Sequence, residues 1–324
     1  MTHPKWQREG DLGEEEAPRR ARLVSRAPDA PPERSRAAGV RLDVGLLVER
    51  RYLEQAQPNG LAAALALRGH RVHLVDPGSR AFRLDADRWP ESLDLVIARG
   101  RSWELLCLLA WAESLGVPTV NHRAAIGAVH NKAEMAVVLE HARIPTPSTC
   151  VAPARALDDS VRACGVRFPL VLKPLFGDNG RGLRVVRDRA ELASVQWPEA
   201  AMLVQELMPS EGYDRKIYGI GDEIWVVMKP SPLAAATRTG PARASGGEAE
   251  PVPVMPEDHE LAARCRRAFG LELYGIDCIE TPQGAVVVEV NDFPNYSSVP
   301  RASERMAEHV LRVSRRALHA GRRR

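Results

Sequence analysis

The pattern of apolar positions divides the chain into a polar beginning and a body that alternates in the manner of a globular protein. Up to about residue 125, short apolar runs alternate with stretches of helical periodicity. Strands are expected at Leu42–Val48, Arg71–Val75, Asp94–Ala98 and Val117–Val120, and helices near Leu61–Leu67 and Trp103–Leu115. Such alternation predicts a parallel α/β lobe over 41–125, with Pro118 indicating an edge position or a strand start.

Beyond residue 126 the pattern changes to antiparallel strands with fewer helices. A helix at Lys132–His141 is expected to end before Pro145. Strands are then expected at Phe168–Lys173, Leu183–Val186 and Met202–Leu207, followed by a hairpin from Lys216 to Val227 and a last pair at Gly275–Glu280 and Ala285–Val290. These hairpins predict an α+β domain over 126–320. An amphipathic helix closes it, because Met306, Val310 and Val313 recur at helical spacing.

Three segments offer little that could be buried. Residues 1–40 combine charge with five prolines and are expected to be disordered. Residues 321–324 form a basic tail. The segment Ala234–Pro256 is rich in Gly, Ala, Pro and Ser, and its length is typical of a lid over a site.

Composition excludes several classes of protein. The chain of 324 residues is 44% hydrophobic and 27% charged, and no apolar run approaches the ~18 residues of a membrane span. The acidic Glu14–Glu16 argues against a secretory signal. The net charge of +3 is concentrated in the arginine-rich end, where helical spacing favours a closing helix over a nucleic-acid interface. We therefore expect no membrane association, and nucleic acid is not a favoured partner.

Five cysteines are scattered without metal-ligand spacing, and their odd number argues against a closed disulfide framework. They are Cys107, Cys150, Cys164, Cys265 and Cys278. We expect all five to be thiols in the core or at the surface of a cytoplasmic protein.

Two carboxylates and an amide near the end of the chain predict a metal site. Glu289 and Asn291 lie two apart on one strand and so point to the same face, while the turn at Gln283-Gly284 folds Asp277 back towards them. Three oxygen donors suit a hard cation such as Mg²⁺, with Mn²⁺ as an alternative. A polar outer face of a hairpin is the competing interpretation, although the valines of this strand make a solvated glutamate less expected.

A lysine followed by glycines predicts a phosphate site. Lys173 ends an apolar strand, and Gly177, Gly180 and Gly182 follow at Gly-x-x-Gly-x-Gly spacing, with Arg181 between the last two. Glycines let backbone amides approach phosphate oxygens, and lysine supplies a point charge. A flexible hairpin is the alternative, since Asp178-Asn179-Gly180 is good turn sequence.

A third segment could hold a nucleotide base. The strand at Val204 continues through Gln205, Glu206, Leu207 and Met208 to Pro209, and Asp214 follows. Backbone groups at such a hinge can pair with an adenine edge, and a nearby carboxylate can accept ribose hydroxyls. Taken alone, the segment could be no more than the end of a strand.

The order of these segments resembles the ATP-grasp superfamily, and within it the RimK-like amino-acid ligases. The resemblance covers about residues 41–320, so two C-terminal lobes are expected to clasp ATP. It implies that Lys132 and Lys173 contact the α- and β-phosphates while Gly177–Gly182 closes over the β/γ end. It further implies that Glu206–Met208 binds adenine, that Asp214 lies beside the ribose, and that Asp277, Glu289 and Asn291 hold the metal.

This resemblance implies an ATP-dependent ligase that joins a carboxylate to an amine through an acyl phosphate. Small-molecule carboxylate and amine substrates, such as amino acids or peptides, are then the partners, and no oligomeric state follows. Lys229 is expected to contact the transition state, with Arg238 as a second cation. Arg99, Arg101 and Ser102 are expected to offer acceptor contacts from the N-terminal lobe, and ordinary surface charge is the competing interpretation of Arg99 and Arg101.

Two departures from the family pattern keep alternatives open. The run Asn291–Tyr296 resembles the Asn-x-Phe-Pro-x-Tyr run of inositol-phosphate kinases, which share the fold. The basic-Ser-Asn triplet of RimK-like enzymes has no counterpart in Ala234–Ser245, although Lys229, Arg238 and Arg243 are available. A small-molecule kinase and a non-catalytic nucleotide-binding module are therefore the competing functions.

Overall fold

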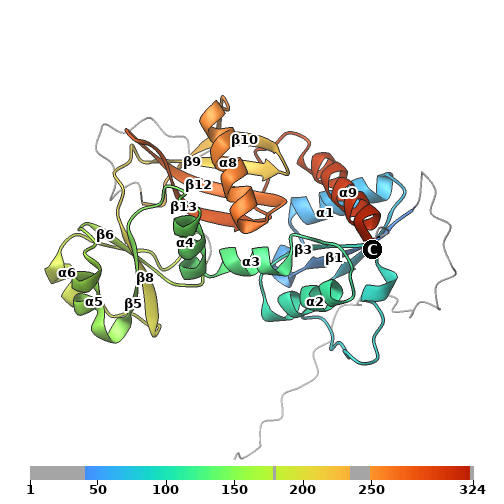
Figure 1. The fold of residues 1–324 in the computed structure, drawn as a ribbon, viewed down its shortest axis with the longest axis horizontal. Coiled ribbons are helices and arrows are strands. Elements are labelled where there is room, and N and C mark those ends of the chain that lie inside the picture. Colours follow the sequence, from blue (N-terminus) through green and yellow to red (C-terminus); the bar gives the residue numbers. More distant parts are fainter. Residues whose placement is uncertain (1–40, 178–179, 234–248, 322–324) are drawn as a thin grey trace, which may run out of the picture. The chain divides into compact units, whose positions relative to one another are not determined.

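The computed structural model describes residues 41–177, 180–233 and 249–321, and these belong to one compact unit (Figure 1). The predictions of a disordered 1–40, of Arg238 as a site residue and of most of a lid at 234–256 concern residues that lie outside these ranges. Within that segment the structure describes a strand at its far end, β11 (Glu250–Val252), and Pro256 already begins helix α8.

The N-terminal lobe is built on a parallel sheet, as predicted. Its strands run in the order β2 (Arg71–Val75), β1 (Asp43–Val48), β3 (Leu95–Arg99) and β4 (Thr119–Val120). The short β4 lies at an edge, where Pro118 indicated it. Both inner strands are buried along their whole length, which explains why they read as continuous apolar runs.

Helices cover both faces of this sheet. Alternate residues of a strand point to opposite faces: Val44 and Leu46 of β1 pack in a cluster that contains α1 (Ala56–Leu67) and α9 (Ala302–Gly321). Leu47 points the other way, towards α2 (Trp103–Ser114). The first and last long helices of the described chain therefore lie side by side (Figure 1).

A four-stranded antiparallel sheet forms the middle of the chain. Its order is β5 (Thr149–Pro153), β8 (Ala201–Glu206), β6 (Leu170–Lys173) and β7 (Arg184–Val186), with helices α5 (Leu157–Cys164) and α6 (Arg189–Ala193) packed against it. The prediction that all cysteines are thiols is wrong here, because Cys150 and Cys164 form a disulfide, with their Cα atoms 6.3 Å apart. An odd number of cysteines leaves room for one local pair. The other three are free.

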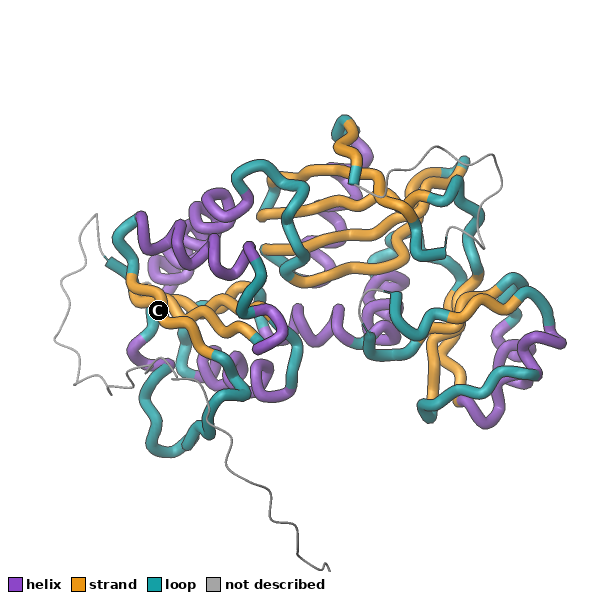
Figure 2. Tube along the Cα trace, turned by 180° about the vertical axis from the view of Figure 1, so that it is seen from behind, coloured by secondary structure: helices purple, strands orange, loops and turns teal. Residues whose placement is uncertain are grey.

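The largest sheet has five antiparallel strands (Figure 2). Their order is β11 (Glu250–Val252), β10 (Glu223–Pro230), β9 (Tyr213–Ile220), β12 (Leu273–Thr281) and β13 (Gly284–Asp292). One face is covered by α3 (Arg123–His130), α4 (Lys132–His141) and α8 (Pro256–Phe269). The short 3₁₀ turns of the described residues are η1 (Arg50–Tyr52), η2 (Pro90–Ser92) and η3 (Ala154–Ala156).

A shared core and one asparagine join the first sheet to the largest one. Phe293 and Tyr296, which follow β13, pack in the same apolar cluster as β1 and β3. Asn121, buried after β4, donates to the Leu273 carbonyl (2.8 Å) and accepts from the backbone amides of Glu272 and Leu273 (2.7 and 3.0 Å). Its one amide group therefore satisfies three buried backbone groups at the start of β12. No helix in the described part of the chain is long and apolar enough to cross a membrane.

Candidate active site

A cavity of about 640 Å³ is lined by residues from all three sheets. Most residues singled out from the sequence line it: Lys132, Lys173, Gly177, Gly180, Arg181, Gln205, Glu206, Leu207, Met208, Asp214, Lys229, Asp277, Glu289 and Asn291. Gly182 instead lines a second cavity of about 850 Å³ that shares Gly177 and Arg181 with the first. Sequence segments that are more than 150 residues apart thus meet around one space.

The predicted metal donors face one another across the last hairpin. Asp277 of β12 pairs directly with Glu289 of β13, so their side chains leave the same face of the sheet. Asn291, two residues further, donates from Nδ2 to the Asp277 Oδ2 at 3.1 Å. The register shifts just after Asp277, which shows a bulge next to the acidic pair. The close approach of these side chains, predicted from strand alternation, is confirmed.

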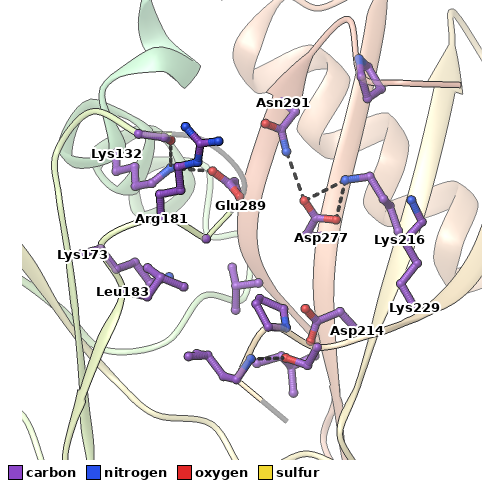
Figure 3. Close-up of a pocket in the computed structure, with 18 of the residues that line it drawn as sticks. Lys132, Lys173, Arg181, Leu183, Asp214, Lys216, Lys229, Asp277, Glu289 and Asn291 are labelled. Atoms are coloured by element: carbon purple, nitrogen blue, oxygen red, sulfur yellow. Dashed lines mark hydrogen bonds and ion pairs between the residues drawn. The ribbon is translucent and has the colours of Figure 1, made fainter. Parts of the chain in front are cut away.

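Each carboxylate of this pair is bound by a lysine from another element (Figure 3). Lys132, at the start of α4, donates to Glu289 Oε1 at 2.5 Å, and Lys216 of β9 donates to both oxygens of Asp277 at 2.7 and 3.0 Å. Burial opposes the charge on Glu289, but the hydrogen-bonded Lys132 and the more distant Lys173 and Arg101 together outweigh it and lower the pKa of the carboxyl. Burial likewise opposes the charge on Lys216, but the charge and the hydrogen bond of Asp277, with smaller contributions from its neighbours, together outweigh it and raise the pKa of this lysine. Glu289 and Lys216 are therefore ionised at neutral pH.

The acidic pair and Asn291 fit a hard divalent cation by their chemistry. They supply carboxylate and amide oxygens, the donors that Mg²⁺ prefers, and few protein ligands are needed where phosphates and waters complete the shell. Among the residues that the structure describes, no cluster of three or more His, Cys, Asp or Glu side chains could hold a metal ion. Asp277, Glu289 and Asn291 supply only part of the shell of such a cation, so waters or phosphate oxygens would complete it.

The surroundings of Lys173 favour the binding of an anion. It is buried, and its Nζ donates to the neutral Gln205 Oε1 at 2.5 Å. Gln205 in turn donates to Thr149 Oγ1 at 3.0 Å, which fixes the amide that orients the lysine. Burial lowers the pKa of Lys173 to about 8, since desolvation disfavours its charged form. A phosphate group in the cavity would favour the charged form and oppose this lowering.

The glycine loop begins next to the first lysine. Lys132 Nζ also donates to the Gly177 carbonyl at 3.1 Å, which joins the loop to the acidic hairpin. Gly180 adopts φ +67°, a conformation that side chains other than glycine rarely take. The loop conformation therefore depends on glycine at this position.

The strand end at 205–208 is fixed by its own hydrogen bonds. The Leu207 amide donates to the Pro169 carbonyl at 2.8 Å, so it cannot also donate to a nucleotide base. The Glu206 carboxylate accepts from the Arg167 amide at 2.9 Å. Burial raises the pKa of the Asp214 carboxyl to about 6, and its buried Oδ1 has no hydrogen-bond partner among the described residues. An incoming hydroxyl donor would satisfy that oxygen.

Sequence reasoning missed Lys216 and Tyr218. The Tyr218 hydroxyl bonds to Lys229 Nζ at 2.7 Å, and both lysines lie within 6 Å of its ring. A signal was present, because Asp214, Lys216 and Tyr218 alternate along β9 and so share one face. The structure brings that face to the cavity.

The N-terminal residues expected to contact an acceptor differ in their availability. Arg101 donates to Asp292 (2.6 Å) and to Asn291 (3.1 Å), so its charge is already used. The Ser102 hydroxyl caps α2 by accepting from the Leu105 amide at 3.3 Å. Arg99 lines the cavity and is held by Gln55.

Comparison with known families decides the class of this site. A model of the RimK-like ATP-grasp domain matches residues 129–311, more than half of the chain. The chain belongs to the RimK-like ATP-grasp family. This ATP-grasp protein is an ATP-dependent carboxylate–amine ligase, and enzymes of its family use ATP with a divalent metal. A kinase of the inositol-phosphate type is not favoured.

The similar proteins cover 78–87% of this ATP-grasp chain. A probable alpha-L-glutamate ligase 1 of Shewanella denitrificans is 29% identical over 78% of this chain and 90% of its own length. A probable alpha-L-glutamate ligase of Maridesulfovibrio salexigens is 27% identical over 81% and 91%. A RimK domain ATP-grasp protein of Sphaerobacter thermophilus is 26% identical, with TM-score 0.64 over 83% and 99%. D-alanine–D-alanine ligase of Bacillus anthracis, 15% identical with TM-score 0.63 over 87% and 100%, shares the fold.

Proposed function

We propose that this ligase activates the carboxylate of an amino acid or peptide with ATP and joins it to an amine, with L-glutamate as one of its substrates. The observation that carries this proposal is the facing pair Asp277 and Glu289, each bound by a lysine on the wall of one cavity. The substrate is suggested by relatives described as probable alpha-L-glutamate ligases.

Nucleotide binding is assigned to the groups on both walls of the cavity. Lys132 and Lys173 would meet the α- and β-phosphates, and the Gly177–Gly182 loop would cover the β/γ end. Because the amides of Glu206 and Leu207 are bound to the carbonyls of Ser148 and Pro169, the base would use the Glu206 carbonyl and the Met208 amide instead. The unpartnered oxygen of Asp214 would accept a ribose hydroxyl.

Asp277, Glu289 and Asn291 would hold Mg²⁺, which, when bound, would neutralise charge on the transferring phosphates. Lys216 and Lys132 lose their carboxylate partners in that state and become available to phosphate oxygens. Lys229, oriented by the Tyr218 hydroxyl, would contact the γ-phosphate as charge develops on it. We assign these groups to an ATP-grasp domain over 126–320 and the acceptor side to a lobe over 41–125.

The reaction then follows in two displacements. A carboxylate oxygen of the substrate attacks the γ-phosphorus, and the bond to ADP breaks. The amine next attacks the carbon of the resulting acyl phosphate, inorganic phosphate leaves, and the amine nitrogen loses a proton. Positioning and charge neutralisation are the main requirements of both steps, which suits a site of lysines, carboxylates and backbone groups.

The fate of the γ-phosphate tests this function. With ATP, Mg²⁺, L-glutamate and a panel of amino acids and short peptides, we expect ADP, free phosphate and an amide whose mass equals the two substrates less water. Hydroxylamine added in place of the amine should intercept the acyl phosphate as a hydroxamate. Phosphate found on a hydroxyl acceptor, with no hydroxamate under any condition, would overturn the ligase proposal.

A further inference from the structure

Arg99 is a buried cation on the wall of the cavity. It ends strand β3, only 8% of its surface is exposed, and it lines the cavity with Tyr52 and Gln55. Its guanidinium lies 3.9 Å from the centre of the Tyr52 ring and 5.5 Å from that of Phe293. Two aromatic rings therefore hold the plane of the guanidinium in place.

The hydrogen bonds of Arg99 are incomplete. Its Nη2 donates to the neutral Gln55 Oε1 at 3.0 Å, whereas its buried Nε has no partner among the described residues. No carboxylate of the described residues forms an ion pair with it. Arg101, two positions along, is different, because it is paired with Asp292. Asp292 is bound to Arg101 and acts on Arg99 only at longer range, so Arg99 has no carboxylate in direct contact.

Such an arrangement costs free energy in the folded protein. A buried charge without a partner is strongly disfavoured, and burial lowers the pKa of Arg99 accordingly. An aliphatic side chain at this position could pack between the rings without that cost. The two ring contacts offset part of this cost, and the binding of an anion by the partnerless Nε would offset more of it.

We propose that Arg99 binds a carboxylate of the substrate that does not take part in the reaction. The planar fork of a guanidinium suits a carboxylate, and its one positive charge matches one negative charge. The reacting carboxylate is a poor candidate, because a direct pair with arginine would withdraw electron density from the oxygen that must attack phosphorus. This inference rests on the proposed ligase function, and it restricts the substrates to those with an additional carboxylate.

That carboxylate has two possible sources: the second acid group of a dicarboxylic amino acid, or the free C-terminus of the amine acceptor. Steady-state kinetics separate them through two matched pairs, L-glutamate against L-glutamine, and one acceptor as free acid against its carboxamide. The variants are Arg99→Met and Arg99→Lys, and the control is Arg50→Met, whose exposed side chain pairs with Asp76. In the pair whose acid carries the carboxylate that Arg99 binds, Arg99→Met should lower kcat/KM for the acid about 10- to 100-fold, mainly through KM, and leave kcat/KM for the amide unchanged.

A binding measurement keeps the inference testable if no amide product forms or if a variant is inactive. Sodium glutarate should raise the melting temperature of the wild type, and glutaramide should not. In Arg99→Met the two compounds should have the same effect on the melting temperature. Without ligand, this variant should be no less stable than the wild type. Arg99→Lys should retain a weaker response, and it replaces Arg99→Met if the latter does not fold. Equal kinetic losses for acid and amide in both pairs, or an undiminished glutarate shift in the Arg99 variants, would overturn the assignment.

Discussion

Two lysines that face the same cavity are held by different groups, and this difference predicts different roles. Lys173 is buried against the neutral amide of Gln205, so a phosphate would be its first anionic partner. Lys229 is held at the Tyr218 hydroxyl. We expect Lys173→Ala to weaken binding of a non-hydrolysable ATP analogue about 10- to 100-fold, whereas Lys229→Ala should chiefly lower kcat. Calorimetry and steady-state kinetics measure the two effects.

The same lysine predicts a pH dependence of nucleotide binding. Because burial lowers the pKa of Lys173 to about 8, the free protein loses this charge as the pH rises through 8. Bound phosphate favours the protonated form, so the affinity should fall between pH 8 and 9.5. The fall should disappear in Lys173→Met and persist in Lys229→Ala. Equal ATP affinity in wild type and Lys173→Ala would remove Lys173 from the site.

Individual side chains of the site were predictable where strand alternation alone decides their direction. Asp277, Glu289 and Asn291 follow from two strands and one turn. The pairing of Lys132 with Glu289 was not predictable, since the helix and the strand are joined only by the tertiary fold. Arg101 and Ser102 were predicted as acceptor contacts, but their side chains already have partners within the protein. Arg101 is paired with Asp292, and the Ser102 hydroxyl caps helix α2.

At the scale of the elements, Asn121 carries the most specific prediction. It is 1% exposed and satisfies three backbone groups of β12 from the end of β4. Asn121→Ala should lower the free energy of unfolding by about 1–3 kcal/mol, because the amides of Glu272 and Leu273 lose their acceptor, whereas the Leu273 carbonyl keeps the Phe293 amide. Chemical denaturation measures it, with Asn59→Ala in the exposed part of α1 as the control. A change below that of the control would show that water replaces the amide.

Elements with a clear apolar run or helical spacing were predictable, and even the mostly exposed β2 was located at its observed bounds. The fully buried β1, β3 and β6 and the regular α4 were located to within two residues at each end. Helix α8 was missed because it is mostly polar, although its buried Leu261, Cys265 and Phe269 recur every four residues. Weak amphipathic helices of this kind are stabilised by the sheet that they cover more than by their own sequence.

At the scale of the whole molecule, the described chain is less divisible than its sequence suggests. The change of pattern near residue 125 predicts a boundary, yet β1, β3, Phe293 and Tyr296 share one apolar cluster. Sequence patterns report the type of local structure, and they contain no information about which buried faces meet. The cavity depends on that meeting, because its walls come from all three sheets.

The two ion pairs at the acidic hairpin make the cavity resemble an ion exchanger that is loaded with its own counter-ions. A bare divalent cation would have to displace Lys132 and Lys216, leaving two ammonium groups without a carboxylate partner in a buried place. A triphosphate that arrives with the cation offers those lysines new anions, so the exchange conserves charge.

The protein should therefore take up metal and nucleotide together. Mg²⁺ alone should leave the melting temperature unchanged, and Mg²⁺ with a non-hydrolysable ATP analogue should raise it by several degrees in the wild type and much less in Glu289→Gln. An equal rise with Mg²⁺ alone would mean that the lysines yield to the metal unaided.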